Sequence, residues 1–208
     1  MSGLARMQLP NILTLVRMPM TFAIVGLMYG RWPGAASLAF WLFIAAAVTD
    51  YYDGKLARER GIVSNFGRFM DALADKVVVL GIMIALLDLD YLRLPSVLVI
   101  MLILLVLTRE FLVSGLRMMA ATRGIVVAAD MGGKVKTAIQ MTALGFLLGE
   151  QMVARDALDF WPGFFRGLAE AAHWIGVGLF FVSMWFTVSS MWSYGRKYRH
   201  VLTEGPPR

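Results

Sequence analysis

The chain reads Asp50-Tyr-Tyr-Asp53-Gly54-Lys-Leu-Ala57-Arg58 and, after a gap of eight residues, Gly67-Arg-Phe-Met-Asp71-Ala-Leu-Ala-Asp75. These two runs carry four carboxylates, and the residues on either side of them, 38–48 and 77–87, are strongly apolar. Ionisable side chains are costly among neighbours of membrane-like apolarity, so they are candidates for function.

The spacing of the carboxylates suits two facing helices. A helix over residues 35–58 turns about 100° per residue, which puts Asp50, Asp53, Gly54 and Ala57 on one narrow face. On the next helix, Gly67, Asp71 and Asp75 span only about 80°. Two facing carboxylate pairs form an all-oxygen cage, which suits Mg²⁺, Mn²⁺ or Ca²⁺ better than zinc or copper. Two such ions about 4 Å apart could stabilise an in-line displacement at phosphorus.

The residues between the carboxylates support this interpretation. Gly54 and Ala57 expose the backbone on the carboxylate face, so that a bulky group can approach. Arg58 lies at the rim, where its fork of donors could hold a phosphate. The alternative is that these aspartates are charges at the membrane interface. Four of them in this register, with Gly, Ala and Arg interleaved, favour a functional site.

Composition places the chain among multi-span membrane proteins. Of its 208 residues 59% are hydrophobic, and the mean hydropathy is +0.67. We expect an all-α fold of six transmembrane helices, forming one membrane domain over residues 1–208 with a polar active-site cavity open to the cytoplasm. The net charge of +6 fits basic loops facing anionic lipid and does not indicate nucleic-acid binding. No cysteine is present, so disulfide and thiol chemistry are excluded.

The basic residues predict the orientation of the six helices. The expected spans are residues 11–29, 35–57, 68–87, 94–119, 134–150 and 171–194. Only four basic residues fall on one side of the membrane, namely Arg31, Arg93, Arg155 and Arg166, and the other sixteen fall on the opposite side. The positive-inside rule puts the sixteen-charge side in the cytoplasm. Both termini and the aspartate ends of the second and third helices then face the cytoplasm.

The two runs together resemble the signature of the CDP-alcohol phosphotransferases. That signature is Asp-x2-Asp-Gly-x2-Ala-Arg-x8-Gly-x3-Asp-x3-Asp, and this chain matches it at every defined position. The family transfers a phosphatidyl or phospho-alcohol group from a CDP-linked donor to an alcohol and releases CMP. The resemblance implies an enzyme in which two Mg²⁺ or Mn²⁺ ions are held by four ligands, Asp50, Asp53, Asp71 and Asp75. It also implies that Asp75 is the general base.

The resemblance also implies a site for the CDP-linked donor. The residues expected to receive it are Asn11, Thr14, Gly54, Ala57, Arg58 and Gly67. Asn11 and Thr14 belong to an Asn-x-x-Thr-x-x-Arg run that members of the family often carry near the active site. From the residues alone, Asn11 could equally be an ordinary helix cap.

A second polar stretch supplies cations. It comprises Thr108-Arg109-Glu110-Phe-Leu-Val-Ser114-Gly115-Leu-Arg117 and Gly133-Lys134-Val-Lys136-Thr137-Ala-Ile-Gln140. Such charges are often juxtamembrane, but Arg109 is too deep in its span for that and needs a partner or a wet cavity. That partner could be structural, either Glu110 or an aspartate. Lys134 and Lys136 are about 200° apart on a helix, so both face one ligand only if Lys134 lies in the preceding turn.

These cation runs resemble those of the bacterial CDP-diacylglycerol–glycerol-3-phosphate 3-phosphatidyltransferases. The resemblance implies CDP-diacylglycerol and sn-glycerol 3-phosphate as substrates. The acceptor phosphate would lie on Arg109, Arg117, Lys134 and Lys136. It further implies a multi-pass protein of the cytoplasmic (inner) membrane, in contact with membrane lipids and forming a homodimer. Two alternatives stay open: a sister enzyme with another acceptor (phosphatidylglycerol, inositol phosphate or serine), and a non-enzymatic cation transporter.

Overall fold

The computed structural model describes residues 9–59, 65–122, 131–157 and 162–197. Within these ranges, the side chains of residues 9–15, 51–59, 65–72, 75, 121–122, 162 and 197 lie outside the description.

Six α-helices follow one another along the described ranges of the chain. They are α1 (Leu9–Tyr29), α2 (Ala35–Glu59), α3 (Asn65–Asp88), α4 (Ser96–Thr122), α5 (Met131–Met152) and α6 (Pro162–Lys197). A short π-helical turn, η2 (Val153–Ala157), continues α5. The described part of the chain contains helices and turns and no strand, which confirms the expected all-α class. The sixth helix begins at Pro162, well before the expected residue 171.

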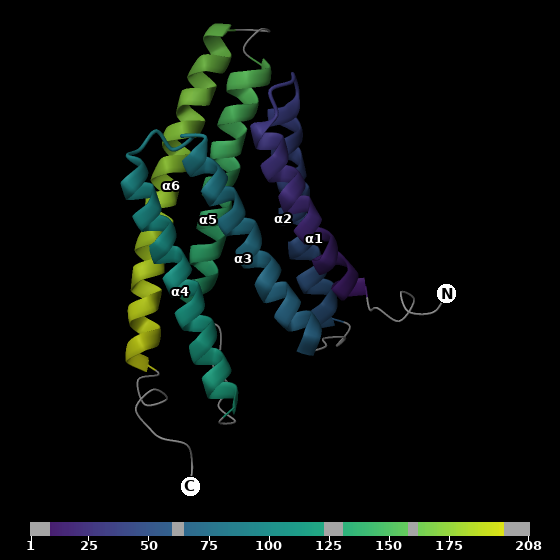
Figure 1. The fold of residues 1–208 in the computed structure, drawn as a ribbon, viewed down its shortest axis with the longest axis vertical. Helices are drawn as coiled ribbons and strands as arrows, with labels where there is room; N and C mark the ends of the chain where they lie inside the picture. Colours follow the sequence, from purple (N-terminus) through teal and green to yellow (C-terminus); the bar gives the residue numbers. More distant parts are fainter. Residues whose placement is uncertain (1–8, 60–64, 123–130, 158–161, 198–208) are drawn as a thin grey trace, which may run out of the picture.

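The helices pack into one bundle (Figure 1). Helix α1 contacts both α2 and α3, α5 lies along α6, and α2 contacts α5 while α4 contacts α3 and α6. The core takes large side chains from several helices, including Ile24, Phe43, Ile82 and Phe180, each at most 2% exposed. Because successive helices alternate in direction, the end of α2 and the start of α3 lie toward the same end of the bundle. The aspartate runs are therefore brought to one end.

Helices α5 and α6 approach each other closely at a glycine. A Cβ placed on Gly176 would lie 3.0 Å from Leu147 Cγ and 3.2 Å from Phe146 Cβ. Core side chains leave little room for even one added methyl group. The glycine therefore lets α6 press against α5, the helix that carries Lys136.

At the end of the bundle away from the aspartates, η2 holds the start of α2. The Asp156 carboxylate accepts hydrogen bonds from the Gly34 and Ser37 backbone amides at 3.0 and 2.7 Å and from the Ser37 hydroxyl at 2.7 Å. Burial raises the pKa of Asp156, but the bonds from Ser37 and Gly34 and the charge of Arg155 lower that pKa more, so the net pKa is below its usual value. Asp156 thus acts as a charged cap for α2 from a distant part of the sequence.

A buried carboxylate at this same end is fully paired. Glu150 is 0% exposed, and its two oxygens contact Arg93 Nη2 at 2.5 Å and His173 Nδ1 at 2.9 Å. A buried charge is tolerated only when it is paired and hydrogen-bonded. Glu150 therefore ties α5 to α6 and to the turn between α3 and α4, which is a structural role.

Two helices of the described chain are long and apolar enough to cross a membrane by length and composition. They cover Ser96–Ala120 and Gly163–Arg196. The apolar stretches Val16–Tyr29 and Ala35–Asp50 are shorter. The expected helical class is thus confirmed, whereas the number of membrane spans stays a prediction. Charged residues in α3 and α5 lower the apolarity of these two helices.

Candidate active site

One aspartate of the signature is described in full, and it is paired. Asp50 lies in α2, and its carboxylate forms an ion pair with the Arg17 guanidinium of α1. The Arg17 side chain is 7% exposed and that of Asp50 is 44% exposed. The carboxylate is therefore partly open to solvent, while its cationic partner is buried between helices. Arg17 is the last residue of the Asn-x-x-Thr-x-x-Arg run, so this run is tied to the aspartate helix.

The other residues predicted for the carboxylate end have only their backbone described. Asn11 and Thr14 lie in α1; Asp53, Gly54, Ala57 and Arg58 lie in α2; Gly67, Asp71 and Asp75 lie in α3. Their side chains lie outside the description. The helical backbone over 50–58 and 67–75 satisfies the condition on which the spacing argument depends. Helix α1 packs on both α2 and α3 and so joins the two aspartate helices.

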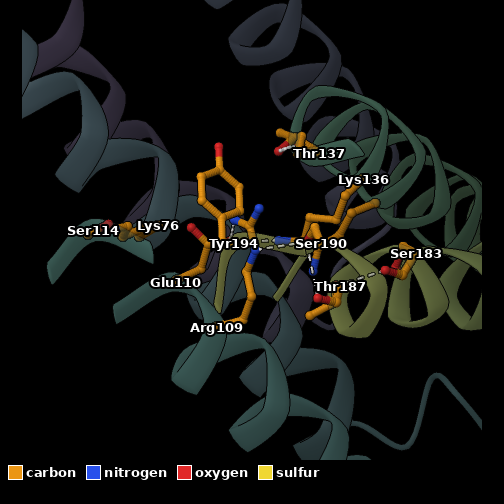
Figure 2. Close-up of polar contacts among 12 residues, drawn as sticks. Lys76, Arg109, Glu110, Ser114, Lys136, Thr137, Ser183, Thr187, Ser190 and Tyr194 are labelled. Carbon is orange, nitrogen blue, oxygen red and sulfur yellow. Dashed lines mark hydrogen bonds and ion pairs between the residues drawn. The ribbon is translucent and has the colours of Figure 1, made fainter. Parts of the chain in front are cut away.

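The predicted cations of α4 and α5 meet at one carboxylate (Figure 2). Glu110 Oε1 accepts a hydrogen bond from Arg109 Nη1 at 2.8 Å and one from Lys136 Nζ at 2.9 Å. Arg109 Nε also donates to the Ser190 hydroxyl of α6 at 3.2 Å. The side chains of Arg109 and Lys136 are 7% and 3% exposed, and that of Glu110 is 20% exposed. We call Arg109, Glu110 and Lys136 the charged triad.

The other two predicted acceptor residues, Arg117 and Lys134, take no part in the described bonds of the triad. Arg117 is exposed; its Nη2 donates to the Tyr194 hydroxyl at 2.9 Å, and its guanidinium lies 5.7 Å from the Tyr194 ring centre. Lys134 lies inside α5, which begins at Met131, so the preceding-turn position needed for Lys134 and Lys136 to face one ligand is not found. Lys134 is exposed while Lys136 is buried, as their 200° separation on a helix requires.

Several residues near the triad were not predicted from the sequence. Lys76, next to Asp75, donates to the Ser114 hydroxyl of α4 at 2.6 Å and lies 5.9 Å from the Phe111 ring centre. The sequence feature that could have pointed to Lys76 is its position directly after the signature residue Asp75. Ser190 and Tyr194 come from α6, far along the chain, and no local pattern pointed to them.

The side chain of Gln140 is buried with one amide atom unsatisfied. It is 1% exposed, and its Nε2 donates only to the Met83 sulfur, at 3.4 Å. Its Oε1 has no hydrogen-bond partner among the described residues. A buried polar atom without a hydrogen-bond partner costs free energy. Gln140 follows Lys136 by one helical turn and so lies on the same side of α5.

The residues at the carboxylate end suit a divalent metal by their chemistry. All four predicted ligands are carboxylates, the donor type that Mg²⁺ and Mn²⁺ prefer, and Asp50 is exposed enough for an ion to reach it. Among the side chains that the structure describes, no group of three or more His, Cys, Asp or Glu residues could hold a metal. Three of the four predicted ligands lie outside that set.

Fold and site together define an all-helical protein that has two helices apolar enough to span a membrane, a carboxylate end and a buried charged triad. Residues 7–188 match the profile of the CDP-alcohol phosphatidyltransferase family. A relative from Bacillus subtilis (strain 168), a CDP-diacylglycerol--glycerol-3-phosphate 3-phosphatidyltransferase, is 37% identical over 201 residues, which are 91% of this chain and 94% of the relative. A probable phosphatidylglycerophosphate synthase from Mycobacterium tuberculosis (strain CDC 1551 / Oshkosh) is 38% identical over 71% of this chain and 69% of its own.

One similar protein carries a different name. A cardiolipin synthase (CMP-forming) from Oryza sativa subsp. japonica is 32% identical over 93% of this chain and 58% of its own length. The profile match covers most of the sequence, and the Bacillus relative is matched over nearly its whole length. This chain belongs to the CDP-alcohol phosphatidyltransferase family.

Proposed function

We propose that this chain transfers the phosphatidyl group of CDP-diacylglycerol to sn-glycerol 3-phosphate, forming phosphatidylglycerol phosphate and CMP. The observation that carries the proposal is the charged triad, in which two buried cations, Arg109 and Lys136, meet at the Glu110 carboxylate. The names of the Bacillus and Mycobacterium relatives support the same reaction.

The reaction is a single displacement at phosphorus. The 1-hydroxyl oxygen of glycerol 3-phosphate forms a bond to the phosphorus that carries the diacylglycerol. The bond from that phosphorus to the CMP oxygen breaks, and CMP leaves with the electron pair. The hydroxyl proton passes to Asp75, which we assign as the general base. Asn11, Thr14, Gly54, Ala57, Arg58 and Gly67 would bind the CDP-linked donor.

Divalent metal ions are general to the family. Here we assign Asp50, Asp53, Asp71 and Asp75 as ligands of two Mg²⁺ or Mn²⁺ ions. When bound, such ions neutralise the diphosphate charge and lower the pKa of a nearby hydroxyl. The ion pair between Arg17 and Asp50 gives this carboxylate a cationic partner from α1.

We assign binding of the acceptor phosphate to Arg109 and Lys136. Both are buried, and hydrogen bonds between charged groups are stronger than neutral ones. The Lys136 ammonium has three donors, and its one described bond is to Glu110. Arg117 and Lys134 are exposed, so we assign them to the rim, where they attract the anionic acceptor.

The nearer alternative is a sister enzyme of the same family that uses another acceptor. The rice relative, which is named a cardiolipin synthase, is an example of a differently named member. Phosphatidylglycerol and serine lack a phosphomonoester, so they offer no dianion to the buried Arg109 and Lys136, which share the single charge of Glu110. The cation cluster therefore favours a phosphorylated acceptor. A cation transporter is the more distant alternative, and family membership argues against it.

An assay of CMP release tests the reaction. The purified protein in lipid should release CMP from CDP-diacylglycerol when glycerol 3-phosphate is added. Phosphatidylglycerol, inositol phosphate and serine serve as competing acceptors in parallel reactions. Release with phosphatidylglycerol but not with glycerol 3-phosphate would replace this function with that of the rice relative.

We further propose six membrane spans in the cytoplasmic (inner) membrane, with the active-site cavity and both termini on the cytoplasmic side. The support is the excess of basic residues on that side. A reporter fused after Arg208 is therefore expected to be active in the cytoplasm. Labelling of that end from outside the cell would overturn this topology.

A single domain over residues 1–208 and a homodimer stay predictions. Measuring the particle mass in lipid nanodiscs checks the homodimer.

A further inference from the structure

One oxygen of Glu110 joins the two buried cations of the triad. Arg109 Nη1 and Lys136 Nζ both donate to Oε1, at 2.8 and 2.9 Å. Two cations held this close in a poorly hydrated interior would repel each other strongly without an anion between them. Glu110 therefore occupies the place between the cations that an anionic oxygen of a ligand would also favour.

The triad keeps donors that Glu110 does not use. One described bond engages the Lys136 ammonium, and Arg109 donates to Glu110 through Nη1 and to Ser190 through Nε. A carboxylate presents two oxygens, whereas a phosphomonoester presents three and carries nearly twice the charge. A phosphomonoester can thus displace Glu110 from the cations, while a weaker anion cannot do so easily.

The Glu110 side chain is more exposed than the two cations and can move away from them. It is 20% exposed, against 7% for Arg109 and 3% for Lys136, so it lies at the open edge of the triad. A partly exposed carboxylate is less costly to release from an ion pair than a fully buried one. Arg109 is held by a further bond, to Ser190, and its Nη2 lies beside Gly133, while Lys136 is held by its burial at 3% exposure.

We propose that Glu110 competes with the phosphate of the acceptor, and with the same phosphate in the product, for Arg109 and Lys136. This inference rests on the proposed function. Competition selects for doubly charged phosphates, since weaker anions do not displace the carboxylate. It also lets the product leave, because Glu110 returns to the cations as the phosphate departs.

The test replaces Glu110 with Gln in the full-length protein. Gln keeps a hydrogen-bond acceptor of the same length but removes the competing charge. The KM for glycerol 3-phosphate and the inhibition constant for inorganic phosphate should both fall by about tenfold, the factor that 1.4 kcal/mol represents. The kcat should fall too, with a burst of CMP in the first turnover, because product release becomes slower.

Two further variants sharpen the result. Glu170→Gln makes the same change at a 57% exposed carboxylate paired with Arg93, at the opposite end of the bundle, and should leave all these constants unchanged. Glu110→Asp shortens the reach of the carboxylate, so competition weakens and inorganic phosphate should inhibit more strongly than in the wild type. If the Gln variant does not fold, phosphate inhibition of Glu110→Asp tests the same competition.

Weaker inhibition by phosphate in either Glu110 variant would overturn the proposal, since Glu110 would then only position the two cations. Unchanged inhibition in both would overturn it as well. A wild-type protein that does not use glycerol 3-phosphate would contradict the proposed function instead. Phosphate inhibition, measured with whichever acceptor is used, would still decide the role of Glu110.

Discussion

Asp71→Asn is expected to lower turnover by several orders of magnitude while the protein still inserts and folds. The backbone of α3 is helical from Asn65 onward, so Gly67, Asp71 and Asp75 share one face spanning about 80°. Asn keeps the shape of the side chain but removes the negative charge that we assign to two divalent ions. A metal-assisted displacement at phosphorus loses much of its charge stabilisation when a ligand is neutralised.

The measurement is CMP release at saturating Mg²⁺ with matched amounts of folded protein. Asp90→Asn is the matched control, because Asp90 is exposed in the turn after α3 at the opposite end of the bundle. Its φ of 52° is one that Asn tolerates well. Near-normal activity of Asp71→Asn at saturating Mg²⁺ would remove this residue from the metal site.

Arg109→Gln is expected to raise the KM for glycerol 3-phosphate by roughly 10- to 150-fold with little change for CDP-diacylglycerol. The range corresponds to about 1.5–3 kcal/mol for one charge-assisted hydrogen bond. Arg109 is 7% exposed and lies in the triad, so its loss also leaves Lys136 as the only buried cation there. Substrate titrations on the purified variant measure both constants.

Two other variants show whether the change in KM is specific to Arg109 and to glycerol 3-phosphate. Arg166→Gln, at an exposed position near the start of α6, should leave both KM values unchanged. Arg58→Gln should raise the KM for CDP-diacylglycerol more than that for glycerol 3-phosphate, since Arg58 belongs to the helix assigned to the donor. If Arg109→Gln and Arg58→Gln weakened both substrates equally, the two arginines would be structural.

The sequence alone determined the number of helices in the described part of the chain and the spacing of the aspartates, but not the start of α6, which lies at Pro162 and not at residue 171. Apolar runs and helical periodicity are local properties, so the second helix, expected at 35–57, is found at Ala35–Glu59. The signature that runs from Asp50 to Asp75 was sufficient to identify the family, which the profile match over residues 7–188 confirms. A charge within a strongly apolar stretch singled out Arg109 from the sequence.

Only the tertiary structure decided which charges meet. Lys134 and Lys136 are alike in sequence, but the helix start at Met131 turns one outward and the other into the bundle. The bonds of Arg109 to Glu110 and to Ser190, and of Lys136 to Glu110, join three helices. Such contacts depend on how α4, α5 and α6 pack, and helical periodicity carries information only about one helix at a time.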